Sequence, residues 1–442
     1  MESFLNRVFK IRELNTDIKT EVRAGVTTFM TMSYIIFVQP AVLSVAGMDF
    51  GAVMVATCLS SAVATFLMAF LANYPIALAP AMGHNFFFVF TVVIGMKIPW
   101  ESALGAIFIS GSLFVLISVL GFIDKIILAV PETLKNAIAV GIGLLIAVVG
   151  LEWSGLVVDS PGTLVTLGNL KSPPVILSLF GIALIAILLS LRVKGAILWG
   201  ILATALAGLP FGMVKYYGIT SKPPSLLPTL FKLDIMGAFD LGIITVVFIF
   251  FFLDLFDTVG TLIGVGQEAG FIRNGKLPRA KGAFLADAIG TVQGALLGTT
   301  TVTSYIESLA GVSEGGRSGL ANIITALLFL ISIFFYPLAK MIGGGFQVSE
   351  GNILYPVTAP VLVIIGSIML RTTSEIPWKD YTEAIPAFLT LIIMPLTFSI
   401  TEGIAFGFIS YSLLKLISGR RREVHWLIHL FAILFIFRYA FT

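Results

Sequence analysis

Charged residues are scarce in this sequence. Of its 442 residues, 27 are Lys or Arg and 24 are Asp or Glu, so charged residues make up 12% of the chain, about half of the share in a typical soluble protein. Apolar residues (AVILMFWYC) make up 57%, and the mean hydropathy is +1.02. This composition excludes a water-soluble enzyme, a nucleic-acid binder and a disordered scaffold. We expect an integral membrane protein that is surrounded by the lipid bilayer and has no nucleic-acid partner.

Cysteine and histidine are also scarce. The single cysteine, Cys58, lies in an apolar run and cannot form an internal disulfide. The three histidines form no cluster with Cys58 at the spacing of metal ligands, so we expect no metal site and no cofactor. Residues 1–23 have mixed charge and lack the compact apolar core of a cleaved signal peptide.

The rest of the sequence consists mainly of apolar runs. A helix needs about 20 apolar residues to cross the hydrocarbon core, which leaves room for roughly 12–15 crossings and no sizeable soluble domain. The seven runs of the first half lie near 24–46, 51–73, 76–96, 102–122, 131–151, 174–192 and 195–214. The seven of the second half lie near 236–267, 282–298, 299–312, 319–345, 353–370, 384–400 and 402–418. A further run at 424–441 suits an interfacial helix, and a fifteenth span stays open.

The basic residues indicate how these spans are oriented. If the N-terminus is cytoplasmic, nineteen Lys and Arg residues fall in the inside segments. The six in the outside segments are Lys97, Lys171, Lys215, Lys222, Lys232 and Lys340. An excess of basic residues in cytoplasmic loops is expected from the positive-inside rule. The bias favours fourteen spans and a cytoplasmic N-terminus in a multi-pass protein of the cytoplasmic membrane.

The two halves of the chain predict an inverted repeat. Since each half has seven spans, the second half enters the membrane from the side opposite to the first. Asn85 and Glu307 belong to comparable interruptions and lie 222 residues apart. Val130-Pro131 and Tyr355-Pro356 open later spans at a separation of 225 residues. Both separations are close to half of the chain length.

The third and tenth runs are poor spanning helices. The third contains Pro80, Gly83 and Asn85, and the tenth has β-branched residues before Glu307. Each predicts an extended piece followed by a half-helix, which begins near Asn85 in one and near Ile306 in the other. Broken backbone at membrane depth is tolerated only where protein or a water-filled cavity satisfies its polar groups. Matched interruptions in two halves indicate the midplane site of a transporter; the alternative is a pair of re-entrant loops that only pack.

Two acidic residues lie deep in the eighth run. Asp254 and Asp257 stand in an apolar stretch, where each charged carboxylate costs about 2.5–3.5 kcal/mol at the bilayer centre, so they need partners, protons or water. Helical spacing places both on one face with Thr261. Gly260 and Gly264 would let another helix approach closely. The alternative is that one Asp only caps a neighbouring broken helix.

Two further acids lie in apolar runs. Glu307 is one residue inside the predicted half-helix, where the helix dipole favours a carboxylate, and capping alone would also explain it. Asp287 suits either a proton relay or an acceptor for Ser and Thr hydroxyls. Carboxylates, the Asn85 amide, hydroxyls and Phe rings together suit a flat, uncharged ligand with ring N–H donors. An anion is disfavoured because no basic residue offsets these acids.

Several motifs resemble those of one transporter family. They are TTFMTMSYIIFVQP (27–40), PAMGHNFFF (80–88), FFLDLFDTVGTLIGV (251–265), ADAIGTVQGALLGTTTVTSYIESLAGVSEGGRSGL (286–320) and GIAFGFISY (403–411). Essentially the whole chain is similar to the azaguanine-resistance (AzgA-like) purine permeases of the nucleobase:cation symporter-2 group, within the nucleobase/ascorbate transporter family. The motifs of the eighth and tenth runs are the specific ones.

The resemblance implies a fold and a division into domains. The fold would be all-α and polytopic, with fourteen spans in two inverted seven-span repeats and with extended pieces and half-helices in segments 3 and 10. After a cytoplasmic N-terminus (1–23), the core domain would comprise 24–122 (spans 1–4) and 236–345 (spans 8–11). The gate domain would comprise 123–235 (spans 5–7) and 346–442 (spans 12–14 and a C-terminal helix). The sequence leaves open whether two copies form a homodimer.

The resemblance also implies a site and an activity. Asp257 and Glu307 would hold the base, and the substrate-binding residues would be Asn85, Phe86, Asp254, Asp257, Thr261 and Glu307. Glu307, Asp257 and Asp287 are the candidates for proton coupling. The activity would be uptake of adenine, guanine or hypoxanthine driven by H⁺, with Na⁺ as the alternative ion.

These observations lead to a mechanistic hypothesis with two alternatives. We expect alternating access, in which Glu307, with Asp257, takes a proton as a purine docks between the half-helix tips. One alternative is an anion transporter of similar fold, which needs a basic residue near a half-helix tip. The other is an intramembrane prenyltransferase that uses Asp254 and Asp257 to hold Mg²⁺ and diphosphate.

Overall fold

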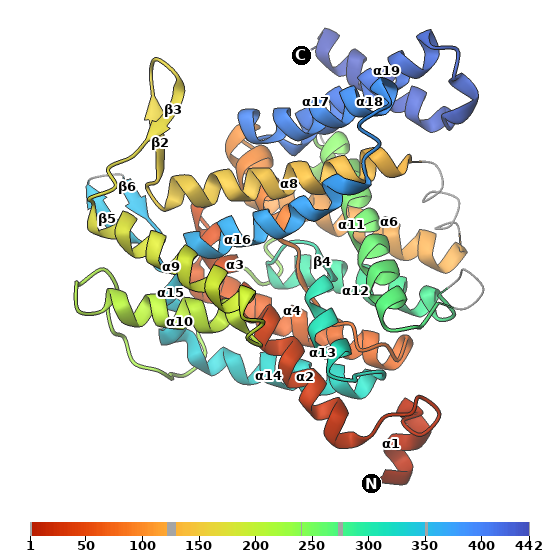
Figure 1. The fold of residues 1–442 in the computed structure, drawn as a ribbon. Helices are drawn as coiled ribbons and strands as arrows, with labels where there is room; N and C mark the ends of the chain where they lie inside the picture. The colour runs from red at the N-terminus through yellow and green to blue at the C-terminus, as the bar shows by residue number, and fades with distance from the viewer. Residues whose placement is uncertain (1, 122–129, 240, 273–276, 350–351, 442) are drawn as a thin grey trace.

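The computed structural model describes residues 2–121, 130–239, 241–272, 277–349 and 352–441. This part of the chain is predominantly helical and contains three short two-stranded sheets (Figure 1). Eight of its helices are long and apolar enough to cross a membrane, and four shorter apolar helices accompany them. A predominantly helical protein with several candidate membrane-spanning helices is thereby confirmed. The count of fourteen spans in an inverted repeat stays a prediction.

The elements of the first half follow its apolar runs. They are α1 (Glu2–Phe9), α2 (Ile18–Met32), α3 (Ile35–Val45), α4 (Phe50–Leu71), β1 (Leu78–Pro80), α5 (Met82–Phe86), the π-helix η1 (Phe87–Gly95), α6 (Trp100–Leu120), α8 (Glu132–Trp153), β2 (Val157–Ser160), β3 (Leu164–Leu167), α9 (Pro173–Ser190) and α10 (Ala196–Gly208). The first run is divided between α2 and α3, with Ser33 and Tyr34 at the break.

The elements of the second half also follow its apolar runs. They are η2 (Gly237–Phe239), α11 (Leu241–Glu268), α12 (Ala280–Leu297), β4 (Val302–Ser304), η3 (Ile306–Ser308), α13 (Leu309–Ser313), α14 (Gly319–Ser332), η4 (Ile333–Phe335), α15 (Tyr336–Gly343), β5 (Phe346–Ser349), β6 (Asn352–Leu354), α16 (Ala359–Met369), η5 (Leu370–Glu375), α17 (Tyr381–Thr397), α18 (Ile400–Ile417), η6 (Arg421–Glu423) and α19 (Trp426–Phe441). The C-terminal run thus forms the helix α19, which packs against α18.

Two short strands from opposite halves of the chain pair in the interior. β1 and β4 run antiparallel, with Leu78 opposite Ser304 and Pro80 opposite Val302, and all of their residues are buried. β1 leads into α5 and η1, and β4 leads into η3 and α13. Each of the two interrupted segments therefore has the expected extended piece and half-helix. The pairing gives the buried strands backbone partners that lipid could not provide.

One of the two half-helices begins earlier than expected. The second begins at Ile306, as predicted, but the first begins at Met82 rather than near Asn85. Ala81 is the last extended residue, with φ −75° and ψ 128°. The Asn85 amide does not cap the helix, because it bonds to the side chains of Gln39 and Thr300. Asn85 thus lies in the body of the half-helix and not at its tip.

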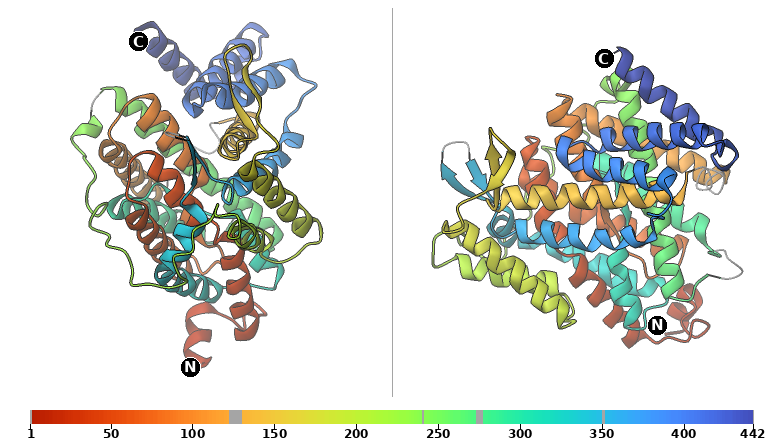
Figure 2. Two further views of the ribbon diagram at one scale, coloured as in Figure 1. Left: turned by 90° about the vertical axis from the view of Figure 1, so that its left-hand side faces the viewer. Right: turned by 45° about the horizontal axis from the view of Figure 1, so that its top comes forward.

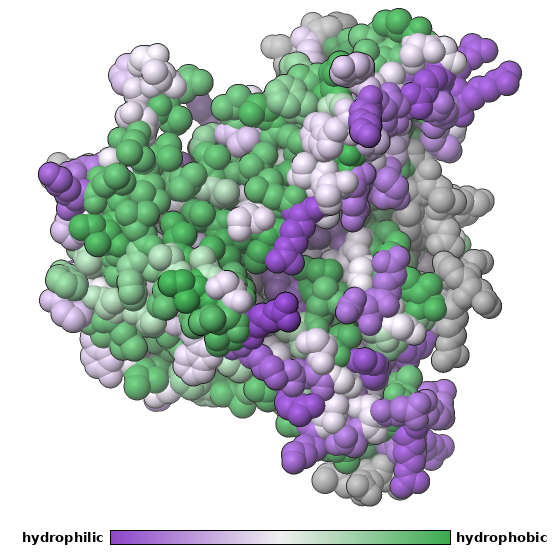
Figure 3. Space-filling model, viewed as in Figure 1, coloured by the Kyte–Doolittle hydropathy of each residue, from purple (hydrophilic) through white to green (hydrophobic). Residues whose placement is uncertain are grey.

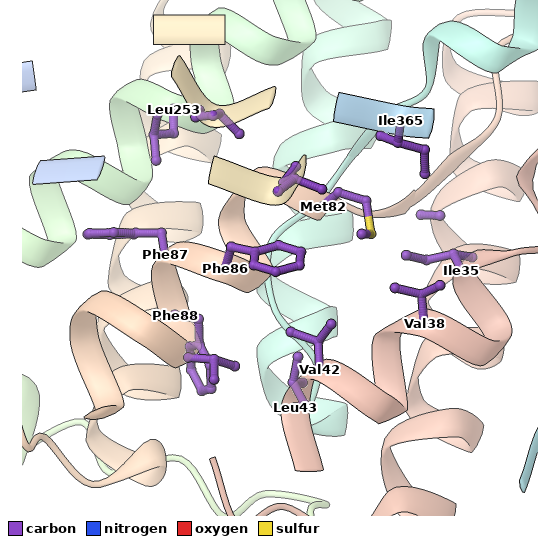
Figure 4. Packing of buried hydrophobic residues seen from close by; sticks show 14 of the residues in the cluster. Ile35, Val38, Val42, Leu43, Met82, Phe86, Phe87, Phe88, Leu253 and Ile365 are labelled. Atoms are coloured by element: carbon purple, nitrogen blue, oxygen red, sulfur yellow. The ribbon is translucent and has the colours of Figure 1, made fainter. Parts of the chain in front are cut away.

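Apolar side chains hold the first half-helix between two neighbouring helices. In Figure 4, Phe86 projects toward the part of α3 that carries Val42, and Phe87 projects toward α11. The Phe87 ring meets Phe250 of α11 edge to face, with 4.8 Å between the ring centroids. Phe86, Phe87 and Phe250 are fully buried. The position of the tip is therefore fixed by packing on both sides.

The long helices fall into two groups by their packing. In one, α8 packs against α16 and α17, α17 against α18, and α9 against α10 and α16. In the other, α4 packs against α12 and α14, α14 against α2, and α6 against α11 and α12. The left view of Figure 2 shows the yellow-green and blue helices of the first group beside the red, orange and teal helices of the second. Whether these groups act as the predicted gate and core domains stays a prediction.

Polar residues are distributed unevenly over the surface. Figure 3 shows hydrophobic residues over the left part of the face and hydrophilic residues toward the right and near the N-terminus. The hairpins β2–β3 and β5–β6 both lie on the left in the same view (Figure 1). An exposed apolar surface of this extent is typical of a protein in contact with lipid.

Some of the sequence predictions lie outside the described residues. The predicted boundary between core and gate at 122–123 lies there, and so do three of the residues counted as cytoplasmic, Lys125, Arg273 and Lys276.

Glycines allow α8 and α16 to approach closely. A Cβ on Gly143 would lie 2.6 Å from Met369 Cβ and 3.1 Å from the carbonyl oxygen of Gly366. A Cβ on Gly366 would clash with the carbonyl oxygen of Gly143 and lie 2.7 Å from Ala147 Cβ. Small residues permit this backbone approach between helices within a membrane.

We predict that Gly366→Val destabilises the protein by about 1–3 kcal/mol, the usual cost of overpacking. The added side chain meets the backbone of Gly143, which cannot move without shifting α8. The measurement is the melting temperature of the purified protein. Gly162→Val is the control, because a Cβ at Gly162 has open space around it. An unchanged melting temperature for Gly366→Val would contradict the close packing of these helices.

Candidate functional site

A cavity of about 580 Å³ lies where the two half-helices meet. Its wall includes the tips of both, at Ala81 to Gly83 and at Tyr305 to Glu307. α2 and α11 complete this side, and the link between α9 and α10 with the end of α16 forms the other. The cavity is thus bounded by both packing groups of helices.

The two half-helix tips are joined to one another by hydrogen bonds. The Tyr305 amide donates to the carbonyl oxygen of Ala77 at 3.0 Å, and the Ala81 amide donates to that of Thr301 at 2.9 Å. The Tyr305 hydroxyl donates to the carbonyl oxygen of Pro80. Helix N-termini present unpaired N–H groups and the positive end of the helix dipole. Both tips therefore offer hydrogen-bond donors and a positive electrostatic potential at the cavity.

Three of the predicted site residues line the cavity together. They are Asp257 and Thr261 of α11 and Glu307 of η3. The Asp257 side chain is exposed in the cavity, and Glu307 is half-buried. The Tyr34 hydroxyl donates to Glu307 Oε1 at 2.7 Å, which fixes that carboxylate beside the break between α2 and α3. Asp257 and the second Glu307 oxygen are thus available as acceptors for a ligand.

Asp254 and Asp287 lie behind β4, outside the lining of the cavity. Both are fully buried. Asp254 accepts from the Thr291 hydroxyl at 3.0 Å, and Asp287 accepts from the amide and hydroxyl of Ser304 at 2.9 and 3.0 Å. One carboxylate oxygen of each has no hydrogen-bond partner among the described residues. Asp254 therefore does not share the cavity with Asp257 and Thr261, although the three share a helix face.

Asn85 and Phe86 are also absent from the cavity lining. Asn85 is fully buried, and its amide group bonds to Gln39 of α3 and to Thr300 before β4. Gln39 in turn donates to the hydroxyls of Thr299 and Thr300 at 2.9 and 3.1 Å. Phe86 stacks on Phe90, 5.6 Å between centroids. This network ties the first half-helix to α3 and to the start of the tenth segment.

Gly260 and Gly264 of α11 do not lie against the closely packed helix that is predicted for them. A Cβ on Gly260 would have open space around it, and one on Gly264 would meet only Ile306 Cδ1 at 3.4 Å. The prediction of a close helix at this face was wrong, because the face borders the region of the cavity and the half-helix tip.

Sequence reasoning missed most of the lining, including one tyrosine and three basic residues. Tyr34 stands at the break between α2 and α3, which hydropathy does not show, although it lies inside a family-like motif. Arg192, Lys194 and Arg371 also line the cavity. They were counted only as evidence for the orientation of the spans, and the expectation that no basic residue offsets the acids was incomplete.

Most of the chain matches the model of one known protein family. A family model with the description "Permease family" (Xan_ur_permease) matches residues 19–406. This range includes both half-helices and every lining residue. The chain belongs to this permease family. It is therefore a multi-pass membrane transporter and not an enzyme, so the resemblance seen in the motifs is confirmed and the prenyltransferase alternative is excluded.

Curated relatives match along nearly the whole chain. The adenine permease AdeP of Escherichia coli is 45% identical over 441 residues, covering 100% of this chain and 97% of the relative. The guanine/hypoxanthine permease PbuG of Bacillus subtilis is 44% identical over 445 residues, covering 98% and 99%. The nucleobase transporter PlAzg2 of Paenibacillus larvae is 32% identical over 406 residues, covering 91% and 78%.

Solved structures of other transporters show the same fold. The transmembrane domain of the cyanobacterium bicarbonate transporter BicA has a TM-score of 0.63 at 15% identity, covering 86% of this chain and 96% of that one. The murine Solute Carrier 26 family member A9 anion transporter, in the inward-facing state, has a TM-score of 0.63 at 11% identity, covering 95% and 72%. At these identities the likeness concerns the fold and not the substrate.

We predict that the cavity is reached by water-soluble thiol reagents. Ala310 lines it and is partly exposed, whereas Ala288 of α12 is fully buried. With the buried Cys58 replaced by Ala, Ala310→Cys should react at least about tenfold faster than Ala288→Cys, since thiol reactivity requires access. Mass spectrometry of the labelled protein measures both rates. Equal rates, or faster labelling at Ala288→Cys, would show that the cavity is placed wrongly.

Proposed function

We propose that this permease takes up a purine nucleobase, adenine, guanine or hypoxanthine, together with protons across the cytoplasmic membrane. One observation carries the proposal: Asp257 and Glu307 present carboxylates to a cavity between two opposed half-helix tips. Two relatives at 45% and 44% identity, an adenine permease and a guanine/hypoxanthine permease, support purines as the substrate class.

We also propose the architecture that such uptake needs. The chain would have fourteen spans in two inverted repeats, with a core (24–122 and 236–345), a gate (123–235 and 346–442) and a cytoplasmic N-terminus. The link between α9 and α10 is then cytoplasmic, and the cavity that it lines opens to the cytoplasm. The described conformation is inward-facing in this proposal.

Contacts on the opposite side of the cavity support alternating access. A Cβ on Gly83 would lie 2.8 Å from Ile142 Cγ2, so the tip of the first half-helix touches α8 directly. Further along the half-helix, the Thr91 hydroxyl donates to the carbonyl oxygen of Phe398 at 3.2 Å. Both contacts join the first half-helix to the packing group that contains α8 and α17. They would have to separate for the cavity to open outward.

The polar groups of the cavity suit the edge of a purine ring. A carboxylate accepts hydrogen bonds from ring and exocyclic N–H groups, and Asp257 and Glu307 approach from different elements, α11 and η3. Thr261 adds a hydroxyl that can donate or accept. Because Tyr34 already donates to Glu307 Oε1, this carboxylate is held in place before the ligand arrives. Such preorganisation lowers the cost of binding.

The placement of the acids supports a route for the coupled proton. Glu307, with Asp257, would take the proton when the purine binds, since both are reached from the cavity. Asp254 and Asp287 are fully buried, and both bond to hydroxyls at or beside β4, Asp254 to that of Thr291 and Asp287 to that of Ser304. Two buried carboxylates in one site cannot both be charged without a large cost. We propose that this pair keeps one proton, with Asp287 passing it on during the conformational change.

The anion alternative has less support. BicA and Solute Carrier 26 family member A9 carry anions by their names and share the fold. In this chain, however, Asp257 and Glu307 place negative charge at the half-helix tips, where a bound anion would lie. The basic lining residues Arg192 and Arg371 lie instead where α9 and α16 end.

We predict that uptake of labelled hypoxanthine into cells that express the protein is reduced by excess adenine or guanine and not by uracil. A protonophore should abolish accumulation, because the proton gradient supplies the energy. Competition by uracil as strong as that by the purines would contradict the substrate class. Uptake that continues in the presence of the protonophore and depends on Na⁺ would show that Na⁺, and not H⁺, is the coupled ion.

We predict that Glu307→Gln abolishes proton-driven accumulation, because the amide cannot exchange a proton. The measurement is purine uptake into proteoliposomes under an imposed pH gradient. Glu268→Gln at the end of α11 is the control, since Glu268 is exposed and does not line the cavity. If Glu307→Gln still concentrates purine against a gradient, Glu307 does not carry the coupled proton.

A further inference from the structure

The two ends of the cavity differ in charge. Asp257 and Glu307 lie at the half-helix tips, deep among the helices. Arg192 follows the end of α9, Lys194 precedes the start of α10, and Arg371 follows the end of α16. Figure 3 shows hydrophilic residues bordering a hollow near the middle of this face. We call the end lined by Arg192, Lys194 and Arg371 the basic mouth.

Two arginines of the basic mouth keep their charge available. Glu314 at the end of α13 is paired with Lys194 and with Arg23, whose Nε lies 3.0 Å from Glu314 Oε2. This carboxylate is thus neutralised by two cations. Arg192 and Arg371 are exposed and form no ion pair with any residue that the structure describes. Two guanidinium groups therefore face the mouth without a protein counter-charge.

The cavity is larger than a free base requires. A volume of about 580 Å³ lies in the range of pockets for drug-sized ligands, whereas a purine base is a small bicyclic ring. The wall between the two ends is partly formed by α13, which starts next to Glu307 and ends at Ser313 before Glu314. The hydroxyl-bearing residues Ser313, Thr27 and Thr31 belong to the lining as well. A ligand that fills the whole space would have a ring with N–H groups at the end near Asp257 and Glu307. It would carry hydroxyl groups in the middle and an anionic group at the basic mouth.

We propose that the cavity also binds purine nucleoside 5′-monophosphates from the cytoplasm and that they inhibit uptake. The inference rests on the proposed purine site: the base lies against Asp257 and Glu307, and the phosphate is held by Arg192 and Arg371. Planar guanidinium groups bind phosphate oxygens in pairs through charge-assisted hydrogen bonds. A nucleotide that spans both ends occupies the mouth, which has to close before the protein can open outward. Because it binds one state only, it shifts the equilibrium toward that state.

The test measures binding of free base and nucleotide to the same purified chain. Calorimetric titrations use adenine or guanine, whichever binds, its 5′-monophosphate and ribose 5-phosphate. Arg192→Gln/Arg371→Gln should weaken nucleotide binding at least about tenfold, the loss of one or more hydrogen bonds to charged groups, and leave the affinity for the base unchanged. Arg12→Gln, an exposed arginine that does not line the cavity, is the matched control.

The outcomes separate this inference from the proposed function. If the base binds and the nucleotide does not, or if the double variant weakens both equally, the nucleotide site is overturned. If ribose 5-phosphate binds as tightly as the nucleotide, the base end takes no part and the two-ended site is overturned. If neither base nor nucleotide binds, the purine site itself fails, and with it the proposed function.

A second experiment distinguishes a free nucleotide from a lipid headgroup. Titrations in discs of phosphatidylcholine are repeated with phosphatidylglycerol added, and nucleotide affinity should stay the same. Displacement of the nucleotide by the anionic lipid would assign the basic mouth to the headgroup and overturn the proposal. In proteoliposomes, nucleotide enclosed inside should slow purine uptake by the wild type and not by Arg192→Gln/Arg371→Gln. Equal inhibition of both proteins would also overturn it.

Discussion

The structure depends on the pairing of β1 with β4. Each strand belongs to a segment that cannot cross the membrane as one helix, and unpaired backbone groups at this depth would cost several kcal/mol each. The antiparallel pairing satisfies many of these groups, and buried side chains satisfy others: the Thr65 hydroxyl bonds to both the amide and the carbonyl of Leu78 at 3.0 and 3.1 Å. Because the strands lead directly into the half-helices, the same pairing fixes the two tips against each other. The ligand-facing groups of both halves therefore form one unit.

β4 also separates two sets of acids. On one side Asp257 and Glu307 contact the cavity, where water or a ligand can solvate them. On the other side Asp254 and Asp287 are fully buried, and they bond to Thr291 and to Ser304 respectively. The hydroxyls of Thr258 and Thr303 bond to each other at 2.9 Å across the boundary between α11 and β4. The two pairs of acids are thus only one strand apart, as the proposed coupling between substrate and proton requires.

Local sequence signals predicted part of this site, and distant contacts determined the rest. Pro80, Gly83 and the β-branched residues before Glu307 predicted both broken segments, because they disfavour a helix locally. The start of the first half-helix was misplaced because Asn85 is held by Gln39 and Thr300, partners 46 and 215 residues away. Helical periodicity correctly placed Asp254, Asp257 and Thr261 on one face of α11, but it does not show which residues of that face reach the cavity. Asp254 lies about 4–5 Å from Asp257 along the helix axis, where it bonds to Thr291 and does not line the cavity.

The contacts between the two helix groups differ at the two ends of the cavity, and this difference bears on how the protein changes state. At the closed end, Gly83 meets Ile142 through apolar contact, which can slide or separate without leaving a charge unpaired. At the open end, Lys194 and Glu314 already join the α9–α10 link to α13. Since Glu314 also binds Arg23, its charge stays compensated if Lys194 moves. The mouth can therefore change shape without leaving the largely buried Glu314 carboxylate unpaired. If the two groups move against each other as proposed, their movement is limited by what fills the space between them, and the ligand in the cavity is then the main control over the proposed transition.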